Sequence, residues 1–584
     1  MTTTTSEYTL YPKAKPTGEL PPKILERLDE RYLNVGEIRP QSGSAGVSIV
    51  DHGATPGATT DQTAFVQAAL DAAAAAGLPT LVPPGTWTMG GALTLATGAD
   101  LRMAPGAVLD FSGSSATNYV NVSGTTGTSL PAPAARKGDV TMSLSGHGLR
   151  PGDWCLLRSQ DIFDASSTSI THGELIQVAQ VDTGVVTFRT SVCDDYRTGV
   201  TLTPVSMVKD VTISGGAIRG SGSAGDARAG LRGQYVENLR VDQVQFERID
   251  RAHMFVRDSV NVWATRCVFD WAVSTVMGYG VALGDSTRDS GCLFSTFRGV
   301  RHSFTNTNTA TAGTGGVTRR ILFMGNTVED TTLATAGSQL GGDAIDTHTA
   351  AEDIWIIQNT VNRSMGKGIN MECASGIISG NTIDDAFASG IDFHNESDRS
   401  GRVTITGNVV RRSGGYGIQA RTGGRGSSYP TESMIITGNR VEDSVGTGIQ
   451  AGYILTDRGV VVTGNTVVRA KGVSLRLLRL DGVVAHGNYL LGSASIGMEC
   501  NTVVHGVFGP DSIDAGSPTG SWVGIKATNV RLSKITPGSV SVSDPAGVGV
   551  EIGSSCADLA LGPTAHLDAP TPLVNNGPST VRSY

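Results

Sequence analysis

Charge is scarce in this sequence, and long apolar runs are absent from it. Only 17% of the 584 residues are charged, and only 5% are aromatic. No stretch approaches the roughly 20 apolar residues that cross a bilayer, and residues 1–20 hold no apolar signal core. We therefore expect no membrane insertion and no signal peptide.

The cysteine content and the net charge exclude further classes. The seven cysteines lie far apart and include no C-x-x-C pair, so we expect mostly buried free thiols, no disulfide framework and no metal site. A formal net charge of −8 argues against nucleic acid as a partner. We expect no cofactor either.

What the sequence does contain is a phrase that recurs between Gly342 and Gly452. Its copies read GDAIDTH, GKGINME, SGIDFH, YGIQAR and TGIQAG. Repeats of this length are typical of a solenoid in which each copy is one coil. In every copy a polar residue follows an isoleucine, which is the alternation of a strand with one buried face. The isoleucines are Ile345, Ile369, Ile391, Ile418 and Ile449.

A second phrase sets the length of a coil. Gly or Gln followed by Asn recurs at Asn326, Asn359, Asn381, Asn408, Asn439, Asn465 and Asn488. Gly-Asn suits a bend that needs positive φ, so we expect these asparagines to stack as a ladder of turns. Their spacing indicates a coil of about 22 residues with extra loops at one corner. Short strands without a helical period between them predict a parallel β-helix.

The chain before the repeats divides into a leader and a capping region. Residues 1–44 form a polar leader that ends in a short helical pattern. Over residues 59–76, Thr59 and Gln62 indicate a capping box at the start of an amphipathic helix. Such a helix covers the open end of a solenoid. Its predicted apolar stripe is Phe65, Val66, Ala69, Leu70 and Ala73, ending at Gly77.

Two other segments depart from the coil pattern. Residues 136–206 alternate like short antiparallel strands with Gly and Pro turns, which predicts a small all-β insertion. After Asn488 the coil phrase fades, so we expect residues 506–584 to form a β cap with trimer contacts. The predicted divisions are the leader 1–44, the β-helix start 45–135, the insertion 136–206, the main β-helix 207–505 and the cap 506–584.

The beginning of the β-helix resembles a known family. Val50-Asp51-His52-Gly53-Ala54, then Thr60-Asp61 with the helix, then Pro83-Pro84-Gly85-Thr86-Trp87 are similar to the first motifs of the pectate-lyase-like superfamily. That family usually has Tyr or Phe in the place of His52. The resemblance covers residues 45–505 and implies an all-β, right-handed, single-stranded parallel β-helix.

The leader extends this resemblance. Leu28-Asp29-Glu30-Arg31-Tyr32-Leu33-Asn34 resembles the leaders of tail fibres, so the whole chain is similar to bacteriophage tailspikes. That resemblance implies a homotrimer in the virion tail, attached through its N-terminus to other tail or baseplate proteins. It also implies that the protein binds or depolymerises a bacterial surface polysaccharide.

Stacking the coils on the buried isoleucine places polar side chains in two outward columns. The first column reads Phe255, Ala282, Phe304, Asp346, Asn370, Asp392, Gln419 and Gln450. The second, two residues later, reads Arg257, Gly284, Asn306, His348, Glu372, His394, Arg421 and Gly452. Acidic, imidazole and guanidinium groups therefore converge on the coils between 343 and 421, as in a glycan groove.

Three carboxylates in these columns are the predicted catalytic groups. Coils stack about 4.8 Å apart, so we expect Asp346 and Asp392 about 9.6 Å apart at Cα, with Glu372 roughly 8 Å from either. Flexible side chains bring such pairs into the roughly 6.5–9.5 Å range of an inverting glycosidase. Asp346 and Asp392 are the predicted pair, and Glu372 competes for either role. The predicted substrate-binding residues are His348, His394, Arg421, Asn370, Gln419, Asp343 and Glu396.

Three functions remain open at this point. The first is hydrolysis of a bacterial surface polysaccharide, and the second is a lyase or epimerase acting on uronic-acid polymers with a His or Arg base. The third is a spike or adhesin that binds its receptor without cleaving it. Outward polar residues also keep a solenoid soluble without any catalytic duty. The clustering of two histidines, an arginine and three carboxylates on neighbouring coils nevertheless favours a functional site.

Overall fold

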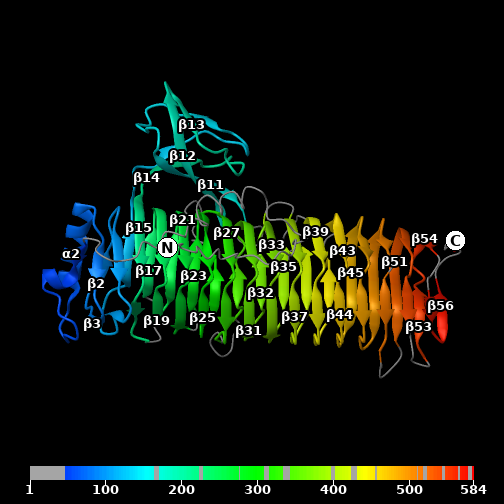
Figure 1. Cartoon of the computed structure of the whole chain (residues 1–584). Coiled ribbons are helices and arrows are strands. Elements are labelled where there is room, and N and C mark those ends of the chain that lie inside the picture. Colours follow the sequence, from blue (N-terminus) through cyan, green and yellow to red (C-terminus); the bar gives the residue numbers. More distant parts are fainter. Residues whose placement is uncertain are drawn as a thin grey trace, which may run out of the picture. The chain divides into compact units, whose positions relative to one another are not determined.

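Three short strands make one coil of a parallel solenoid, and the strands of successive coils pair with one another (Figure 1). The computed structural model describes residues 46–163, 170–222, 228–274, 276–307, 315–332, 342–395, 397, 401–422, 431–453, 457–509, 511–516, 522–541, 546–562, 566–576 and 582–583. The predicted leader, residues 1–44, lies outside the described residues.

The strands form three ladders, one on each side of the coil. The first ladder contains β4 (Leu93–Thr94), β7 (Asn118–Ser123), β17 (Ala229–Gln234), β20 (Ala252–Arg257), β23 (Tyr279–Gly284), β26 (His302–Thr305), β29 (Ile345–Thr347), β32 (Ile369–Glu372), β35 (Ile391–Asn395), β38 (Ile418–Thr422), β41 (Ile449–Ala451), β45 (Val473–Asp481), β48 (Ile496–Val504), β51 (Val523–Ile535), β53 (Val548–Ile552) and β56 (Thr571–Asn575).

The second ladder follows the first along each coil. It contains β1 (Val47–Ser48), β2 (Thr80–Val82), β5 (Asp100–Met103), β15 (Val208–Ser214), β18 (Val236–Asp242), β21 (Val260–Thr265), β24 (Arg288–Leu293), β27 (Thr318–Met324), β30 (Ala351–Ile357), β33 (Ser375–Ser379), β36 (Gly401–Thr406), β39 (Thr431–Thr437), β43 (Val460–Thr463), β46 (Val484–His486), β49 (Val507–Phe508), β54 (Ala557–Leu561) and β57 (Arg582–Ser583). The short β42 (Asp457–Arg458) pairs with the end of β45.

The third ladder has 16 strands, one for each coil that it crosses. They are β3 (Gly85–Thr88), β6 (Ala107–Asp110), β16 (Ala217–Arg219), β19 (Gln245–Ile249), β22 (Val268–Ala272), β25 (Thr296–Arg298), β28 (Thr327–Glu329), β31 (Thr360–Ser364), β34 (Thr382–Ala386), β37 (Val409–Arg411), β40 (Arg440–Glu442), β44 (Thr466–Val468), β47 (Tyr489–Leu491), β50 (Ser512–Asp514), β52 (Ser539–Ser541) and β55 (His566–Asp568).

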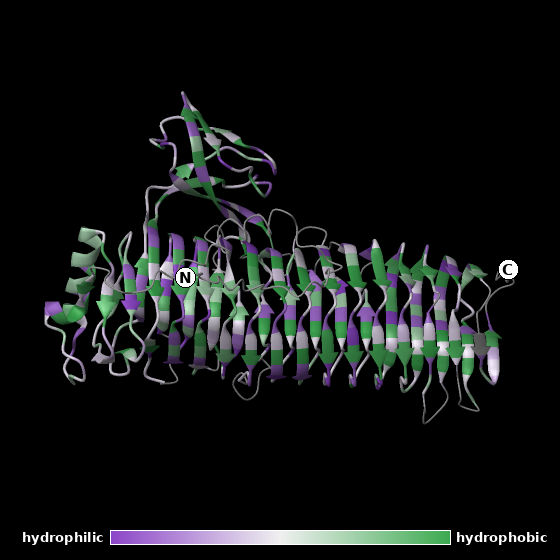
Figure 2. Cartoon of the chain, in the orientation of Figure 1, coloured by the Kyte–Doolittle hydropathy of each residue, from purple (hydrophilic) through white to green (hydrophobic). Residues whose placement is uncertain are grey.

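Apolar side chains point into the solenoid, and the repeated isoleucine forms one column of the core. Ile345, Ile369, Ile391, Ile418 and Ile449 pair in register and are fully buried, as predicted. Figure 2 shows the resulting alternation of hydrophobic and hydrophilic residues along the strands. All seven cysteines are free thiols, and all but Cys193 are buried.

The predicted asparagine ladder is confirmed at the corner between the second and third ladders. Each asparagine donates its side-chain amide to the side-chain oxygen of the asparagine in the next coil, from Asn326 to Asn488. The residue before each asparagine has positive φ, as Gly380 and Gly407 do. Asp511 accepts the last pair of these bonds from Asn488. Every buried amide of the ladder is therefore hydrogen-bonded.

The solenoid does not end at residue 505, contrary to the prediction. Parallel coils continue through β51, β54 and β57 to the end of the described chain. The coil phrase fades because Asp511 occupies the place of the turn asparagine, while the strand pairing persists. Residues 506–584 thus extend the β-helix, and they do not form a separate cap in the part that is described.

The capping helix is present but begins later than predicted. Helix α2 (Thr63–Ala76) follows a short 3-10 helix, η2 (Ile49–His52), and ends at Gly77 with positive φ. Gln62 makes no capping bond; its amide donates to Thr60 and its side-chain oxygen accepts from the Thr55 backbone. The predicted Thr59–Gln62 capping box is therefore wrong. Val66, Ala69, Leu70 and Ala73 are buried as predicted, whereas Phe65 is 41% exposed.

The predicted insertion is a seven-stranded antiparallel sheet with its own core. Its strands are β8 (Thr125–Thr126), β9 (Leu130–Pro131), β10 (Thr141–Ser143), β11 (Trp154–Ile162), β12 (Thr171–Asp182), β13 (Val185–Phe188) and β14 (Thr201–Ser206). The sheet starts at Thr125, before the predicted boundary at 136, because β8 and β9 pair with β14. It contacts the solenoid where Trp154 donates to Glu237 of β18 and Arg158 donates to Asp258, in the turn between β20 and β21.

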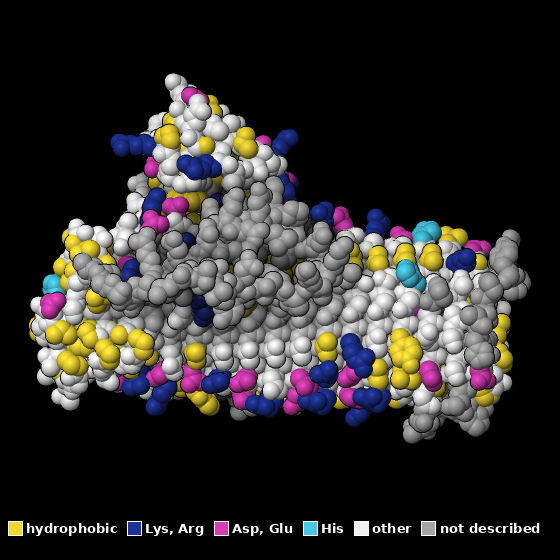
Figure 3. Space-filling model, viewed as in Figure 1, with side chains coloured by type: hydrophobic (Ala, Val, Ile, Leu, Met, Phe, Trp, Pro, Cys, Tyr) yellow, Lys and Arg dark blue, Asp and Glu magenta, His cyan; other side chains and the backbone are white. Residues whose placement is uncertain are grey.

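Charged side chains of both signs line the outside of the third ladder. Ion pairs there join consecutive coils, as between Arg363 and Asp330 and between Arg469 and Asp443. Figure 3 shows basic and acidic side chains interleaved along the lower edge of the solenoid. Within the described residues, no helix has the length and apolar character that crossing a membrane requires.

Breaking the asparagine ladder should destabilise the protein strongly. Asn408→Ala removes a side chain that accepts from Asn381 and donates to the Ile378 carbonyl and to Asn439. Each buried polar group left unpaired costs about 1–3 kcal/mol, so we expect a loss of at least about 3 kcal/mol in the free energy of unfolding. Chemical denaturation measures this loss.

Asn362→Ala is the matched control, because Asn362 lies in β31 on the outer side of the third ladder. A surface change of this kind should stay within about 0.5 kcal/mol of the wild type. Equal effects of the two substitutions would show that the ladder contributes no special stability.

Candidate functional site

The register of the first ladder brings the predicted site residues together. Asp346 pairs with Asn370, Asn370 with Asp392, and Asp392 with Gln419. The second column is also as predicted where strands pair, since Glu372 lies beside His394 and His394 beside Arg421. Strand pairing therefore holds the predicted groups in adjacent coils.

The register before Asp346 differs from the prediction. Phe304 pairs with Ile345 and is fully buried in the core, so Thr305 is the outward residue beside Asp346. Asn306 follows the strand; its side-chain oxygen accepts from the His348 backbone N–H at 2.6 Å. Residues 306–344 separate the two strands of the first ladder, and this long interval concealed the correct alignment.

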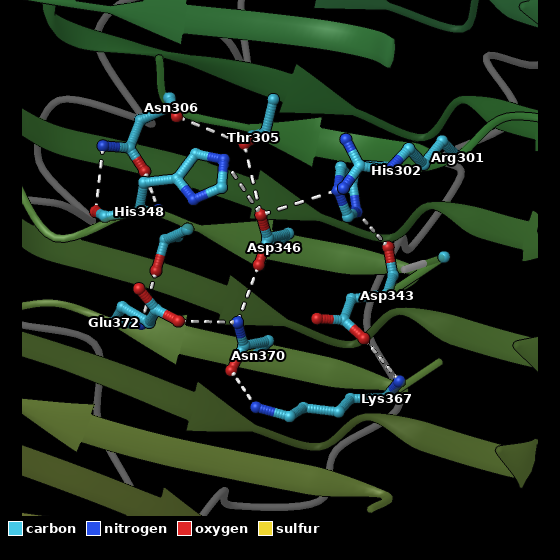
Figure 4. Close-up of polar contacts among 12 residues, drawn as sticks. Arg301, His302, Thr305, Asn306, Asp343, Asp346, His348, Lys367, Asn370 and Glu372 are labelled. Carbon is cyan, nitrogen blue, oxygen red and sulfur yellow. Dashed lines mark hydrogen bonds and ion pairs between the residues drawn. The ribbon is translucent and has the colours of Figure 1, made fainter. Parts of the chain in front are cut away.

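Asp346 stands at the centre of the cluster (Figure 4). Its Oδ1 accepts a 2.8 Å hydrogen bond from the Asn370 amide. Its Oδ2 lies 3.4 Å from His348 Nε2 and 3.5 Å from Thr305 Oγ1, with His302 Nε2 at 3.8 Å. Burial raises the pKa of Asp346, since only 2% of the residue is exposed, and the nearby His348 opposes this rise in part.

His302 and Thr305 were not predicted as site residues. The His302 ring bonds the Asp343 carbonyl at 2.6 Å through Nδ1 and stacks on Tyr279 with the ring centroids 5.5 Å apart. Burial, with the charge of Arg301, lowers the pKa of His302 to about 3. The ring is therefore neutral near pH 7. Placing Phe304 inside the core would have revealed Thr305 as an outward residue, whereas His302 shares the inward parity of Phe304 and has no such signal.

Glu372 has the opposite electrostatic environment to Asp346. His394 Nε2 lies 3.0 Å from Glu372 Oε1, and the Asn370 amide donates to the same oxygen at 3.2 Å. Burial alone would raise the pKa of Glu372, but the bond from His394 and its charge outweigh burial and lower this pKa to about 2. Glu372 in turn raises the pKa of His394 against the effect of burial. The two side chains form an ion pair.

Asp392 is surrounded by cations. Its Oδ2 lies 2.6 Å from Lys367 Nζ and 3.5 Å from Arg421 Nη2, and its Oδ1 lies 3.9 Å from His394 Nδ1. Burial opposes ionisation, yet these three charges hold the pKa of Asp392 below its usual value. Lys367 also donates to Asn370 Oδ1 at 2.8 Å, which links Asp392 to the amide that contacts Asp346.

Lys367 was missed by sequence reasoning, although its signal was present. It stands two residues before Ile369 in the repeated phrase, where the preceding copy has Asp343. The Asp343 Oδ1 accepts from the Lys367 backbone N–H at 2.6 Å. Burial, together with the charge of Asp346, raises the pKa of Asp343 to about 6.

The other predicted binding residues occupy the edges of the cluster. Gln419 is 7% exposed and follows Asp392 in the first column. The Arg421 guanidinium lies 5.6 Å from the centre of the Tyr453 ring. Glu396 lies outside the described residues. No group of three or more His, Cys, Asp or Glu side chains within the described ranges is arranged to hold a metal ion.

One amide therefore joins two carboxyl groups whose pKa values are displaced in opposite directions. The Asn370 nitrogen is 2.8 Å from Asp346 Oδ1 and 3.2 Å from Glu372 Oε1. A carboxyl that retains its proton beside one that is ionised can provide an acid and a base for the same bond. Asp392, Lys367 and Arg421 form a charged support behind this pair.

Removing the cation nearest to Asp392 should destabilise the fold in a pH-dependent way. Lys367→Met leaves a buried carboxylate with only Arg421 and His394 nearby, which we expect to cost about 3 kcal/mol of unfolding free energy near pH 7. The pKa of Asp392 then rises, so protonation relieves the cost as the pH falls toward about 4. Denaturation at several pH values measures the deficit.

The exposed Lys471 supplies the control Lys471→Met, which should change stability by less than about 0.5 kcal/mol at any of these pH values. A Lys367→Met deficit that stays constant with pH would contradict the ion-pair account of Asp392.

Comparison with known proteins identifies the fold. The family model described as right handed beta helix region matches residues 265–429. The tailspike protein gp49 from Pseudomonas phage LKA1 matches with a TM-score of 0.54 at 15% identity, covering 90% of this chain and 84% of that chain.

Two further solved tailspikes match less closely. Gp54 of Acinetobacter baumannii bacteriophage AP22 has a TM-score of 0.47 at 11% identity, with 92% of this chain and 76% of that chain covered. Gp61 of Pseudomonas phage phi297 has a TM-score of 0.47 at 15% identity, with 83% and 80% covered. No curated protein matches the sequence. The chain is a right-handed parallel β-helix, the fold found in the phage LKA1 tailspike.

Proposed function

We propose that this protein is a phage tailspike that binds a bacterial surface polysaccharide and depolymerises it by glycoside hydrolysis. The observation that carries the proposal is the pair formed by Asp346 and Glu372. Burial raises the pKa of Asp346, whereas the bond from His394 lowers that of Glu372 to about 2 against the effect of burial. Glycoside hydrolysis uses one carboxyl that carries a proton and one that is ionised, and these opposite displacements of the two pKa values favour that division of roles.

In the proposed reaction, Asp346 donates its proton to the glycosidic oxygen as the bond to the anomeric carbon breaks. Glu372 acts on the opposite side of that carbon. His394 keeps Glu372 ionised, and Asn370 fixes its position relative to Asp346. Asp392 holds Lys367 and Arg421 in place, so these three residues position substrate and have no part in proton transfer.

The spacing of the pair favours retention of configuration. Because the Asn370 nitrogen contacts both, Asp346 Oδ1 and Glu372 Oε1 are at most about 6 Å apart, below the roughly 6.5–9.5 Å of an inverting pair. Glu372 would then attack the anomeric carbon and form a covalent intermediate that water hydrolyses. The inversion expected for an Asp346–Asp392 pair requires more space.

The assembly of the protein is part of the same proposal. A fold shared with a phage tailspike, together with the tail-fibre resemblance of the leader, supports a location in the virion tail. We propose a homotrimer whose N-terminal leader attaches to other tail proteins. Size measurement in solution by light scattering tests the trimer independently of any activity.

Replacing either member of the pair should abolish cleavage. Reducing-end release is measured on a panel of purified capsular and cell-wall polysaccharides with the wild type, Asp346→Asn and Glu372→Gln. A positioned acid or base contributes about 10²–10⁴-fold to the rate, so we expect losses of that size in kcat for each variant. The anomeric form of the first product, followed by NMR, should be that of the substrate.

Glu329→Gln is the matched control, because Glu329 is ion-paired with Arg298 on the third ladder, away from the site. Loss of activity in Asp392→Asn with full activity in Glu372→Gln would transfer the second catalytic role to Asp392. An unsaturated product would indicate a lyase. Binding without any release would leave the protein a receptor-binding spike.

The pH dependence should identify Asp346 as the acid. Only protonated Asp346 donates, so kcat/KM falls as the pH rises through its pKa. His348 lowers this pKa, and His348→Gln should therefore raise it and move the alkaline limb of the kcat/KM profile up by about 1 pH unit.

His505→Gln serves as the control for this shift, since His505 forms an exposed pair with Asp481 at 2.8 Å on another part of the solenoid. An alkaline limb that stays in place in His348→Gln would mean that a group other than Asp346 donates the proton.

A further inference from the structure

Three arginines surround one aromatic ring on the face that carries the candidate site. The guanidinium carbons of Arg232, Arg251 and Arg257 lie 4.7, 4.5 and 4.8 Å from the centre of the Phe255 ring. Phe255 itself is only 2% exposed. The cluster, called here the arginine cluster, therefore gathers three positive charges around a single buried ring.

Strand register places the arginine cluster on the same outward column as Asp346. Arg232 pairs with Phe255, Phe255 with Ala282, and Ala282 with Thr305. Thr305 is the residue beside Asp346, because Phe304 pairs with Ile345. Three coil steps of about 4.8 Å separate Phe255 from Asp346, so the cluster lies about 14 Å along the column from the candidate acid.

Aromatic and basic groups occupy the interval between the cluster and the carboxylates. Tyr279 packs with Phe255 in one small apolar group and stacks on His302. Arg301 lies 6.0 Å from the centre of the Tyr279 ring, and His302 Nε2 lies 3.8 Å from Asp346. One row of contacts therefore runs from the arginine cluster to the candidate catalytic acid.

Arg232 brings to the cluster a charge that is not paired with a carboxylate of the described residues. Arg257 lies 3.6 Å from Asp285. Arg232 donates to the neutral side chain of Gln234 at 3.2 Å, and within the described ranges no carboxylate lies at ion-pair distance from it. Burial, with repulsion from Arg257 and Arg251, lowers the pKa of Arg232 to about 10, so it remains charged at neutral pH. Proteins seldom bury a guanidinium unless an anion accompanies it.

We propose that Arg232, Arg251 and Arg257 bind an oxyanion carried by the polysaccharide, a carboxylate or a phosphate, so that the substrate is an acidic glycan. This inference rests on the proposed function for its glycan. Guanidinium groups bind both oxyanions through charge-assisted hydrogen bonds, and the adjacent aromatic side chains suit a sugar ring. The anion belongs to a sugar at a distance from the bond that is cleaved.

The test uses small probes, because it then needs no knowledge of the glycan. Binding of D-glucuronate, glucose 6-phosphate and glucose is followed by saturation transfer to the probe in NMR, with the wild type and with Arg232→Gln. We expect transfer to at least one acidic probe and none to glucose. In Arg232→Gln the affinity for that probe should fall about 10-fold, the usual value of one charge-assisted bond.

The control is Arg240→Gln, the same change at an exposed arginine of the second ladder. Transfer to glucuronate alone would identify a carboxylate, and transfer to glucose 6-phosphate alone would identify a phosphate. The proposal fails if neither acidic probe binds, or if Arg232→Gln binds them as the wild type does, which would make the arginines a structural cover for Phe255.

Cleavage separates this inference from the proposed function. Once a cleaved glycan is known, Arg232→Gln should raise KM about 10-fold with little change in kcat, because the cluster does not touch the reacting bond. If the protein cleaves a neutral glycan and Arg232→Gln leaves KM unchanged, the proposed anion site is wrong and the proposed hydrolase activity still stands. If acidic probes bind but the protein cleaves no glycan, the anion site stands and the proposed hydrolase activity is wrong.

Discussion

The structure depends on stacking in register. Each strand of a coil pairs with the equivalent strand of the next, so a side chain lies about 4.8 Å from its counterparts above and below. Stacked side chains in a column must therefore pack, hydrogen-bond or pair in charge with one another. Isoleucines do so by packing, and the asparagines from Asn326 to Asn488 do so because an amide is both donor and acceptor. The same rule would bring like charges together in a column of acids.

In the candidate site, neutral or basic side chains separate the acidic ones along each column, so carboxylates do not stack directly on one another. In the first column Asn370 separates Asp346 from Asp392, donating to the first and joining the second through Lys367. In the second column a cation follows the acid, since His394 lies beside Glu372. Fixed spacing thus determines which carboxyl has a pKa raised by burial and which has a cation beside it that lowers its pKa. The difference between the two acids arises from their column partners.

The sequence predicts correctly the features that recur in every coil. The predictions were wrong where a long loop interrupts the repeat or where a different residue takes the repeated position. The isoleucine column, the turn asparagines and the Asp346 to Gln419 register follow from phrases that recur. The prediction placed Phe304 on the outer face of the strand, because the long interval between Phe304 and Ile345 hides their pairing. The predicted end of the β-helix at residue 505 was wrong, because Asp511 takes the position of the turn asparagine and accepts the same hydrogen bond. Lys367 lies in the repeated phrase, but no spacing rule indicates that its amine reaches across a coil to Asp392.

The corners of the coil explain why chemistry would gather on the first ladder. The asparagine corner admits only two residues between strands, as between β30 and β31, because each amide must meet the next one. Longer intervals fall at the two ends of first-ladder strands, as between β28 and β29 and between β38 and β39. Differences in length between the coils of this chain therefore fall on the side of the solenoid opposite its hydrogen-bonded asparagine corner. A rigid column of paired side chains, flanked by intervals that differ in length between coils, can hold Asp346 and Glu372 in place whatever the length of those intervals. The arginine cluster lies on that same column.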